Sequence, residues 1–163
     1  RSTASGDLVS LDEQDRTLWN QDAITEGCTL VEASLARRGF GAYTLQAAIA
    51  ALHAEANSTA TTDWVQIVGL YDALLNLEPG PVIALNRAVA VGMRDGPEAG
   101  LALIKPLLSD LPKYYAAPAA AAAMCQRAGH LQEAHAHYGL AAALAPHESE
   151  RQFLLRKQAD VFG

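Results

Sequence analysis

Cysteine is nearly absent from this sequence, which limits both disulfide and metal chemistry. The 163 residues contain two cysteines, Cys28 and Cys125, with no CxxC motif and no paired cysteine–histidine spacing. A disulfide-stapled secreted domain would carry more cysteines, so we interpret both as buried free thiols in a reducing compartment. A signal peptide and an apolar run long enough to cross a membrane are also lacking. We therefore predict a cytoplasmic protein without membrane contact.

Positive charge and aromatic side chains are also scarce. Lysine and arginine together number 12 against 18 acidic residues, which gives a net charge of −6, and aromatic residues make up 6% of the chain. An acidic surface repels phosphate backbones. The basic residues near the C-terminus, Arg151, Arg156 and Lys157, are too few to follow a nucleic acid strand. We predict no direct nucleic acid contact by this segment.

Motifs for catalysis and metal binding are missing as well. The sequence has no glycine-rich phosphate loop, nucleophile elbow, HExxH motif or paired-carboxylate constellation, so we predict that the chain is not an enzyme. Histidines are frequent near the C-terminus, at His130, His135, His137 and His147. His135 and His137 are two residues apart, so on a helix they would point in different directions. We therefore predict no metal site and no cofactor.

Alanine and helical periodicity are what the sequence has in place of these features. Half of the residues are apolar, and alanine, the best helix former, supplies much of that half. Apolar residues recur with helical spacing between breaks at glycine, proline and polar turns. We predict an all-α fold with helices over residues 11–38, 42–56, 63–77, 82–94, 97–108, 112–128, 131–144 and 148–161.

Local signals also predict how some of these helices begin and end. Ser10 and Glu13 form a capping box before the first helix, and Thr61 or Thr62 would cap the third. Pro106 is expected to kink or end the fifth helix.

Two blocks of the sequence repeat one another. Each has a tyrosine, Tyr71 or Tyr138, a leucine six residues on and a proline eight residues on. The blocks are about 67 residues apart, close to two tetratricopeptide periods of about 34 residues. The last repeat unit, residues 115–148, matches the tetratricopeptide pattern best, with alanines at the helix contacts, Gly129 at the turn and Tyr138 as its large aromatic residue.

The remaining units are looser, and they complete the predicted architecture. We expect units over residues 48–81 and 82–114, capping helices over 11–38 and 148–161, and a linker over 1–10. A single helix pair cannot bury its own apolar face, so the antiparallel pairs would stack into a right-handed superhelix with a concave side. Stacked helix pairs present surface, which favours binding over chemistry.

Several runs of sequence resemble one known family. They are LDEQDRTLW, GAYTLQAAIAALHAEA, TDWVQIVGLYDALL, PVIALNRAVAV and GPEAGLALI, in this order between Leu11 and Ile104. They are similar to the C-terminal extension of a group of bacterial extracytoplasmic-function (sigma-70 family) RNA polymerase sigma factors. In that group a tetratricopeptide-like domain follows the two promoter-binding regions. The resemblance covers nearly the whole chain from Leu11 on.

The resemblance implies a regulatory role in transcription initiation. The chain would be the C-terminal domain of a longer protein, and it would regulate initiation without reading DNA itself. Its partners would be its own sigma regions or RNA polymerase, a regulatory protein or a small ligand. An acidic domain of this kind could mask the basic DNA-reading surface of the same protein until a signal releases it.

The same resemblance implies candidate site residues. Contact residues on the concave face would be Tyr43, Gln46, His53, Asn86 and Arg87. Residues that fix the fold would be Trp19, Asp63, Trp64, Tyr71 and Tyr138.

Other interpretations of these residues remain open. A single histidine on a helix is commonly a satisfied side chain at the edge of a core, and Asn86 with Arg87 could be a solvated edge or bond to a neighbouring helix. A free-standing tetratricopeptide adaptor, which binds a partner peptide or a small ligand on its concave face, is the alternative function. A homodimer with twofold symmetry is also compatible with the alanine-rich faces.

Overall fold

The computed structural model describes residues 14–36, 40–56 and 58–163, and within them all regular structure is helical. The α-helices are α1 Gln21–Leu35, α2 Ala42–Glu55, α3 Trp64–Leu77, α4 Pro81–Asp95, α5 Pro97–Asp110, α6 Ala116–Ala128, α7 Leu131–Leu144 and α8 Glu148–Ala159. Two single turns of 3-10 helix, η1 Arg16–Leu18 and η2 Thr59–Thr61, precede α1 and α3. The predicted all-α fold is confirmed. No helix in these ranges is both long and apolar enough to cross a membrane.

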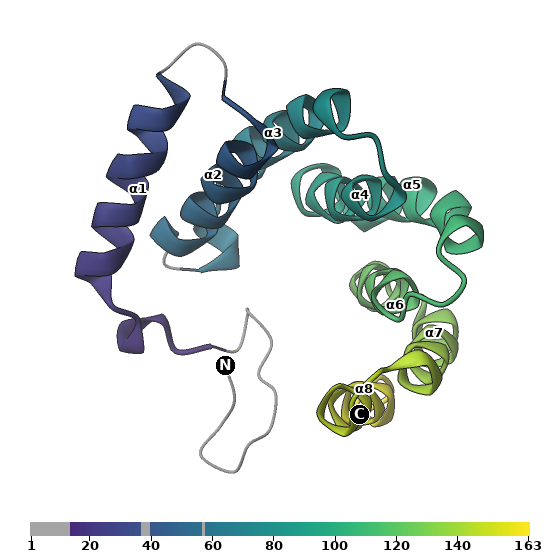
Figure 1. Ribbon diagram of the computed structural model, residues 1–163. Coiled ribbons are helices and arrows are strands. Elements are labelled where there is room, and N and C mark those ends of the chain that lie inside the picture. Colours follow the sequence, from purple (N-terminus) through teal and green to yellow (C-terminus); the bar gives the residue numbers. More distant parts are fainter. Residues whose placement is uncertain (1–13, 37–39, 57) are drawn as a thin grey trace.

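The helices follow one another around an arc (Figure 1). Each helix packs against the next one in the chain, and α4 additionally contacts α6. Helices α2, α4 and α6 lie along the inner side of the arc, and α3, α5 and α7 lie along its outer side. This is the arrangement of stacked helix pairs, in which each pair covers the apolar face of its neighbour. The right-handed twist of the stack stays a prediction.

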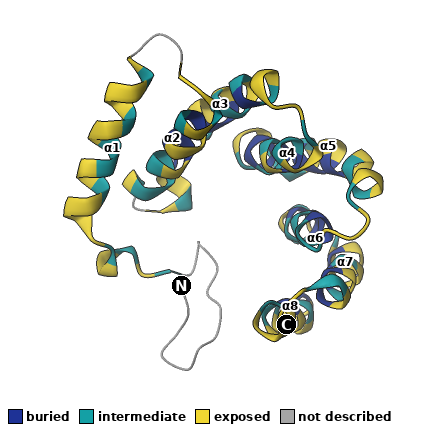
Figure 2. Ribbon diagram, viewed as in Figure 1, coloured by how far each residue is buried: buried dark blue, intermediate teal, exposed yellow. Residues whose placement is uncertain are grey.

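The core runs along the stack in two clusters that share α4 (Figure 2). One cluster joins α2, α3 and α4 around Ile49, Ile67 and Val91. The other extends from α4 to the C-terminal end of the chain around Leu85 and Ile104. Because α4 contributes buried residues to both clusters, the two clusters meet at this helix.

Helices α4 and α5 approach each other closely enough for their backbones to touch. A Cβ atom built on Gly100 would lie 2.8 Å from the Cα atom of Gly92 and 3.2 Å from the carbonyl oxygen of Ala88. Glycine at these two positions therefore allows a contact that any side chain would prevent.

The structure corrects how three helices begin. Asn20 is the N-cap of α1, and its side chain accepts a hydrogen bond from the backbone nitrogen of Ala23. The predicted start at residue 11 is therefore wrong for the described part, where Arg16–Leu18 form η1 instead. The predicted Ser10–Glu13 capping box and the 1–10 linker lie outside the described residues. Residues 112–115 precede α6, which was predicted to begin at 112.

The predicted cap of α3 is also wrong. Asp63, rather than Thr61 or Thr62, is the N-cap, and its carboxylate accepts a hydrogen bond from the backbone nitrogen of Gln66 at 2.9 Å. Thr61 instead closes a capping box with Ser58 at η2. The buried Thr62 donates its hydroxyl hydrogen to the Ser58 carbonyl oxygen at 3.0 Å. Asp63 is the N-cap because an ionised carboxylate interacts more favourably than a hydroxyl with the positive N-terminal end of a helix.

Other boundaries also differ from those predicted, and those at the ends of α5 and α8 differ by two residues each. Helix α5 continues through Pro106 to Asp110, and α8 ends at Ala159. A repeat boundary at residue 48 would fall inside α2, which spans Ala42–Glu55. The helix bounds divide the stack more naturally into the pairs α2–α3, α4–α5 and α6–α7, with α1 and α8 at the two ends.

Candidate functional site

An exposed ion pair joins α3 to α4 on the surface of the stack. The Nε of Arg87 donates to Oδ1 of Asp72 at 2.5 Å, and the two side chains are 30% and 51% exposed. Ion pairs this accessible to solvent contribute only about 0–1 kcal/mol to folding stability. A ligand could therefore separate the two charges with little loss of folding stability.

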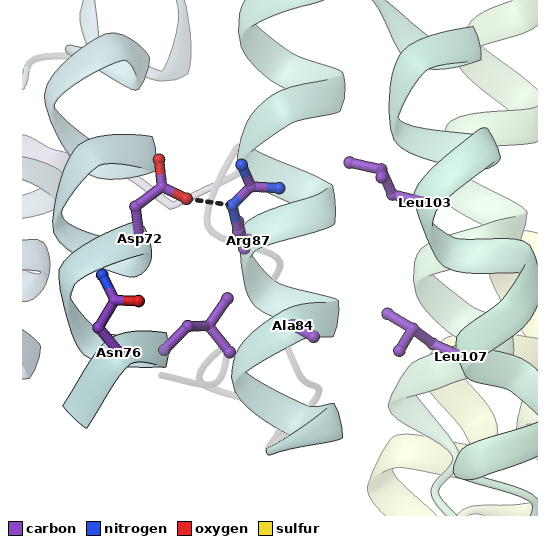
Figure 3. A pocket seen from close by; sticks show the side chains of 7 residues that line it. Asp72, Asn76, Ala84, Arg87, Leu103 and Leu107 are labelled. Atoms are coloured by element: carbon purple, nitrogen blue, oxygen red, sulfur yellow. Dashed lines mark hydrogen bonds and ion pairs between the residues drawn. The ribbon is translucent and has the colours of Figure 1, made fainter. Parts of the chain in front are cut away.

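These charges form one wall of a groove of about 550 Å³ (Figure 3). The residues that line it are Asp72, Leu75 and Asn76 of α3, Ala84 and Arg87 of α4, and Leu103 and Leu107 of α5. Asp72 and Asn76 of α3 and Arg87 of α4 are the polar residues of the groove and lie on the side away from α5, where Leu75 adds an apolar side chain. Leu103 and Leu107 make the α5 wall apolar (Figure 3). Ala84 leaves space at the bottom of the groove because its side chain is a single methyl group. A groove with one polar and one apolar wall suits an amphipathic ligand.

Arg87 contributes to this groove together with residues of α3 and α5, which lie on the outer side of the arc (Figure 1). Its predicted place on the concave face stays a prediction. Asn86 is exposed and is the adjacent residue on α4. Consecutive helical residues point about 100° apart, so Asn86 and Arg87 face different surroundings. The structure does not bring these two predicted contact residues into one site.

The other predicted contact residues lie on α2, along the inner side of the arc. Tyr43 is 88% exposed and Gln46 is exposed as well. His53 is different, because its ring packs edge-on against Trp64 with the ring centroids 5.3 Å apart. Tyr43 and Gln46 remain available to a partner, whereas His53 belongs to the packing between α2 and the start of α3.

Arg16 completes the surroundings of His53 and fixes the end of α2. Its Nη1 donates to the carbonyl oxygen of His53 at 2.9 Å and also to that of Ala56. A guanidinium at these carbonyls satisfies backbone acceptors at the negative end of the helix. Burial lowers the pKa of His53, and the nearby Arg16 charge lowers this pKa further. The imidazole of His53 is therefore held in its neutral form.

Stability should consequently fall in mildly acidic solution in a way that depends on His53. The folded-state pKa of His53 is below the unfolded value of about 6.5. The stability that depends on a neutral His53 is therefore fully present above the unfolded pKa. As pH falls from 7 to 5, the unfolded chain takes up the proton first, and the free energy of unfolding should decrease. His53→Gln should flatten this part of a denaturation-versus-pH curve, whereas His147→Gln, at an exposed position, should leave it unchanged. An equal slope in the wild type and His53→Gln would show that His53 is not the group responsible.

The residues expected to fix the fold make local contacts. Arg16 lies over the ring of Trp19, 5.2 Å from its centroid, and the Nε1 of Trp64 donates to the carbonyl oxygen of Thr59 at 3.0 Å. Asp63 caps α3 as described above. Tyr71 is partly buried, which raises the pKa of its hydroxyl. Tyr138 is 5% exposed and donates its hydroxyl hydrogen to Oε1 of Gln126 at 3.0 Å.

Most of the groove cannot be recognised from the sequence. Asp72, Leu103 and Leu107 were not singled out, although Asp72 and Arg87 have opposite charges on consecutive predicted helices. A search for such charge pairs across a predicted helix–turn–helix could have suggested the contact. The leucines carry no local signal, because a leucine on a helix is ordinarily a core residue.

Comparisons with known proteins find one related sequence and no assigned family. No protein-family model matches the chain, and no solved structure matches it. The chain is 42% identical over 160 residues to a Rhizobium meliloti (strain 1021) protein whose own function is uncharacterized. The match covers 98% of this chain but 38% of that relative, so the chain spans well under half of the relative's length.

Proposed function

We propose that this chain is a regulatory, protein-binding domain of a bacterial RNA polymerase sigma factor, which acts in the cytoplasm by binding and not by catalysis. The groove between α3, α4 and α5, with its charged wall opposite a leucine wall, is the observation that carries the proposal. The sigma-factor part rests on the sequence resemblance. It is supported by the Rhizobium relative, in which the matched region is joined to a larger remainder of the protein.

The groove fits an amphipathic helix of the partner. Leu103 and Leu107 are one helical turn apart on α5, so they present two apolar contacts in a row along the groove. A helix with apolar residues at i and i+4 could pack on both. Asp72 and Arg87 lie on the opposite wall, where they can exchange their mutual ion pair for charges on the polar face of that helix.

The acidity of the chain favours the sigma regions as the source of that helix. The chain has a net charge of −6, and DNA-reading surfaces are basic. Association between an acidic domain and a basic one is steered by charge and weakens as salt screens it. The proposed contact would keep the DNA-reading surface covered until a signal separates the two parts.

Substitution in the groove provides the test. Leu103→Asp places a charge on the apolar wall at a position that is 37% exposed, and it should weaken binding of this domain to the separately purified sigma regions by at least about 10-fold, as expected for a contact residue. Isothermal titration calorimetry measures this affinity. Leu140→Asp is the matched control, because Leu140 is 51% exposed on α7 and should tolerate the charge. The wild-type affinity should also fall as salt is raised.

The outcomes separate the site from the function. Wild-type binding that both variants retain would contradict the groove as the binding site but leave the sigma-factor role. A wild-type domain that binds neither the sigma regions nor RNA polymerase would contradict that role. A photocrosslinker placed at Leu107 in cells would then identify the partner of the alternative, a free-standing adaptor.

A further inference from the structure

Three side chains with different metal-binding atoms meet at the turn between α6 and α7. Cys125 lies in the last turn of α6, His130 follows the end of that helix, and Glu133 lies in the first turn of α7. The sulfur of Cys125, a ring nitrogen of His130 and a carboxylate oxygen of Glu133 all lie within 4.8 Å of one another. This cluster is remote in sequence from the groove between α3, α4 and α5. An inference from the cluster does not depend on the function proposed for that groove.

The backbone at this turn fixes the three side chains in place. Gly129 adopts a left-handed conformation with φ of 81°, which only glycine takes readily. The backbone nitrogen of His130 donates to the Cys125 carbonyl oxygen at 2.9 Å, and that of Gly129 donates to Gln126 at 3.2 Å. These two bonds form a Schellman motif, which reverses the chain and brings His130 back over Cys125. The site is therefore built from a rigid turn and two helix ends.

The imidazole of His130 is oriented by a fourth residue. Its Nε2 lies 3.1 Å from a carboxylate oxygen of Glu98, in the first turn of α5. Its Nδ1 is buried and has no hydrogen-bond partner. Glu98 therefore selects the tautomer that carries the proton on Nε2 and leaves a lone pair on Nδ1. A carboxylate behind the ring of a histidine is the usual arrangement at metal sites, and an unpaired buried nitrogen requires a partner.

We propose that Cys125, His130 and Glu133 bind a divalent transition-metal ion of the zinc class, with Glu98 as the residue that positions His130. Thiolate, imidazole and carboxylate are the three ligand types that proteins use for zinc, and a fourth, tetrahedral position would be left for water. Bond lengths of about 2.0–2.3 Å place ligand atoms about 3.3–3.7 Å apart, so side-chain adjustments of about 1 Å would close the site.

The surroundings allow an ion to enter and the charges to balance. Cys125 is fully buried, but Glu133 is exposed and His130 is partly exposed beside a cavity of about 450 Å³. An ion can therefore reach His130 and Glu133 from this cavity, and the sulfur of Cys125 lies within 4.8 Å of their ligand atoms. Binding breaks the S–H bond of Cys125 and forms a sulfur–metal bond, and the proton passes to solvent. The thiolate and the Glu133 carboxylate then neutralise the two positive charges of the ion.

The spacing of the histidines among themselves predicts no metal site. His135 and His137 are on α7 and take no part in the cluster, as their spacing indicated. The residues that come together are instead Cys125, His130 and Glu133. Their spacing brings the three side chains together only because the left-handed Gly129 reverses the chain between them.

Cobalt(II) titration of the 163-residue chain under reducing conditions tests the proposal. We expect one equivalent to bind per chain, with a near-ultraviolet thiolate-to-cobalt charge-transfer band that zinc abolishes by competition. Cys125→Ser should remove the band, and Cys28→Ser, the matched control at the other cysteine, should retain it. Because Cys125 is buried, Glu133→Gln serves as a second variant at an exposed position and should weaken binding markedly. Glu98→Gln should weaken it by about 10- to 100-fold, as expected when the residue that positions a ligand is removed.

Three results would each overturn the proposal. One is the absence of a charge-transfer band in the wild-type chain. Another is a band that survives Cys125→Ser. The third is a cobalt affinity of both Glu133→Gln and His130→Gln that equals the wild-type affinity. A circular dichroism spectrum that matches the wild type would show that each variant is folded, so a loss of binding can be assigned to the ligands themselves.

Discussion

Gly100→Ala should destabilise this domain by about 1–3 kcal/mol, although alanine is the better helix former. The added Cβ would lie 2.8 Å from the Cα atom of Gly92, which is backbone and cannot rotate away. Relief requires α4 and α5 to separate, and that movement would loosen the core around Leu85 and Ile104, which lies beside their contact. The gain in helix propensity, about 1 kcal/mol, would offset only part of this cost. Chemical denaturation followed by circular dichroism measures the change in the free energy of unfolding.

Gly69→Ala is the matched control for this prediction. Gly69 lies in the middle of α3 with no atom within 4 Å of an added Cβ, and it is exposed. The same chemical change should therefore stabilise the domain by about 0.5–1 kcal/mol. Opposite signs at the two glycines would confirm that α4 and α5 touch through their backbones. Stabilisation by both substitutions would contradict this contact.

The positions of most helices could be predicted because the signals are local. Helix α7, Leu131–Leu144, has the bounds predicted for it, since Gly129 and Pro146 interrupt the helix on either side. The predicted start of the N-terminal helix was wrong because the sequence holds two competing capping signals. One is the pair Ser10 and Glu13, and the other is Asn20. Residues of either kind can accept hydrogen bonds from free backbone N–H groups, and which helix start forms depends on tertiary contacts such as that of Arg16 with the end of α2.

Pro106 illustrates a different limit of the sequence. A proline removes one backbone hydrogen bond and is expected to break a helix, yet α5 continues to Asp110. The residues on either side of Pro106 explain this, because Ile104 is fully buried and Leu107 and Leu108 pack against the same core cluster. Packing on both sides of the proline outweighs the loss of one hydrogen bond, and no local pattern reports that packing.

The candidate sites depend on neighbours that periodicity cannot identify. Helical spacing correctly separates the faces of one helix, but it does not say which other helix each face meets. Arg87 meets Asp72 of the preceding helix, so it belongs to the groove between α3, α4 and α5. Likewise, His53 is drawn into packing with Trp64, while Tyr43 on the same helix stays exposed. These outcomes are decided by how the helix pairs stack.

The C-terminal helix should be the part of the stack most sensitive to a single core substitution. Among the helices described, α8 is the last and packs against α7, and Leu154 is its buried residue. A helix of 12 residues is marginally stable in water by itself. Leu154→Ala should cost about 2–5 kcal/mol, which is enough to detach α8 and not merely to loosen it. Hydrogen exchange should then be fast over residues 148–159.

The adjacent leucine gives the control, and the N-terminal half of the stack gives the second readout. Leu155 is 40% exposed, so Leu155→Ala should leave exchange in α8 nearly unchanged. In Leu154→Ala, exchange in α2 and α3 should stay slow, because stacked repeats contact only their neighbours and stability is a sum of local terms. Simultaneous loss of protection from α2 to α8 would contradict this view. It would mean that α4, which takes part in both core clusters, couples the whole stack into one cooperative unit.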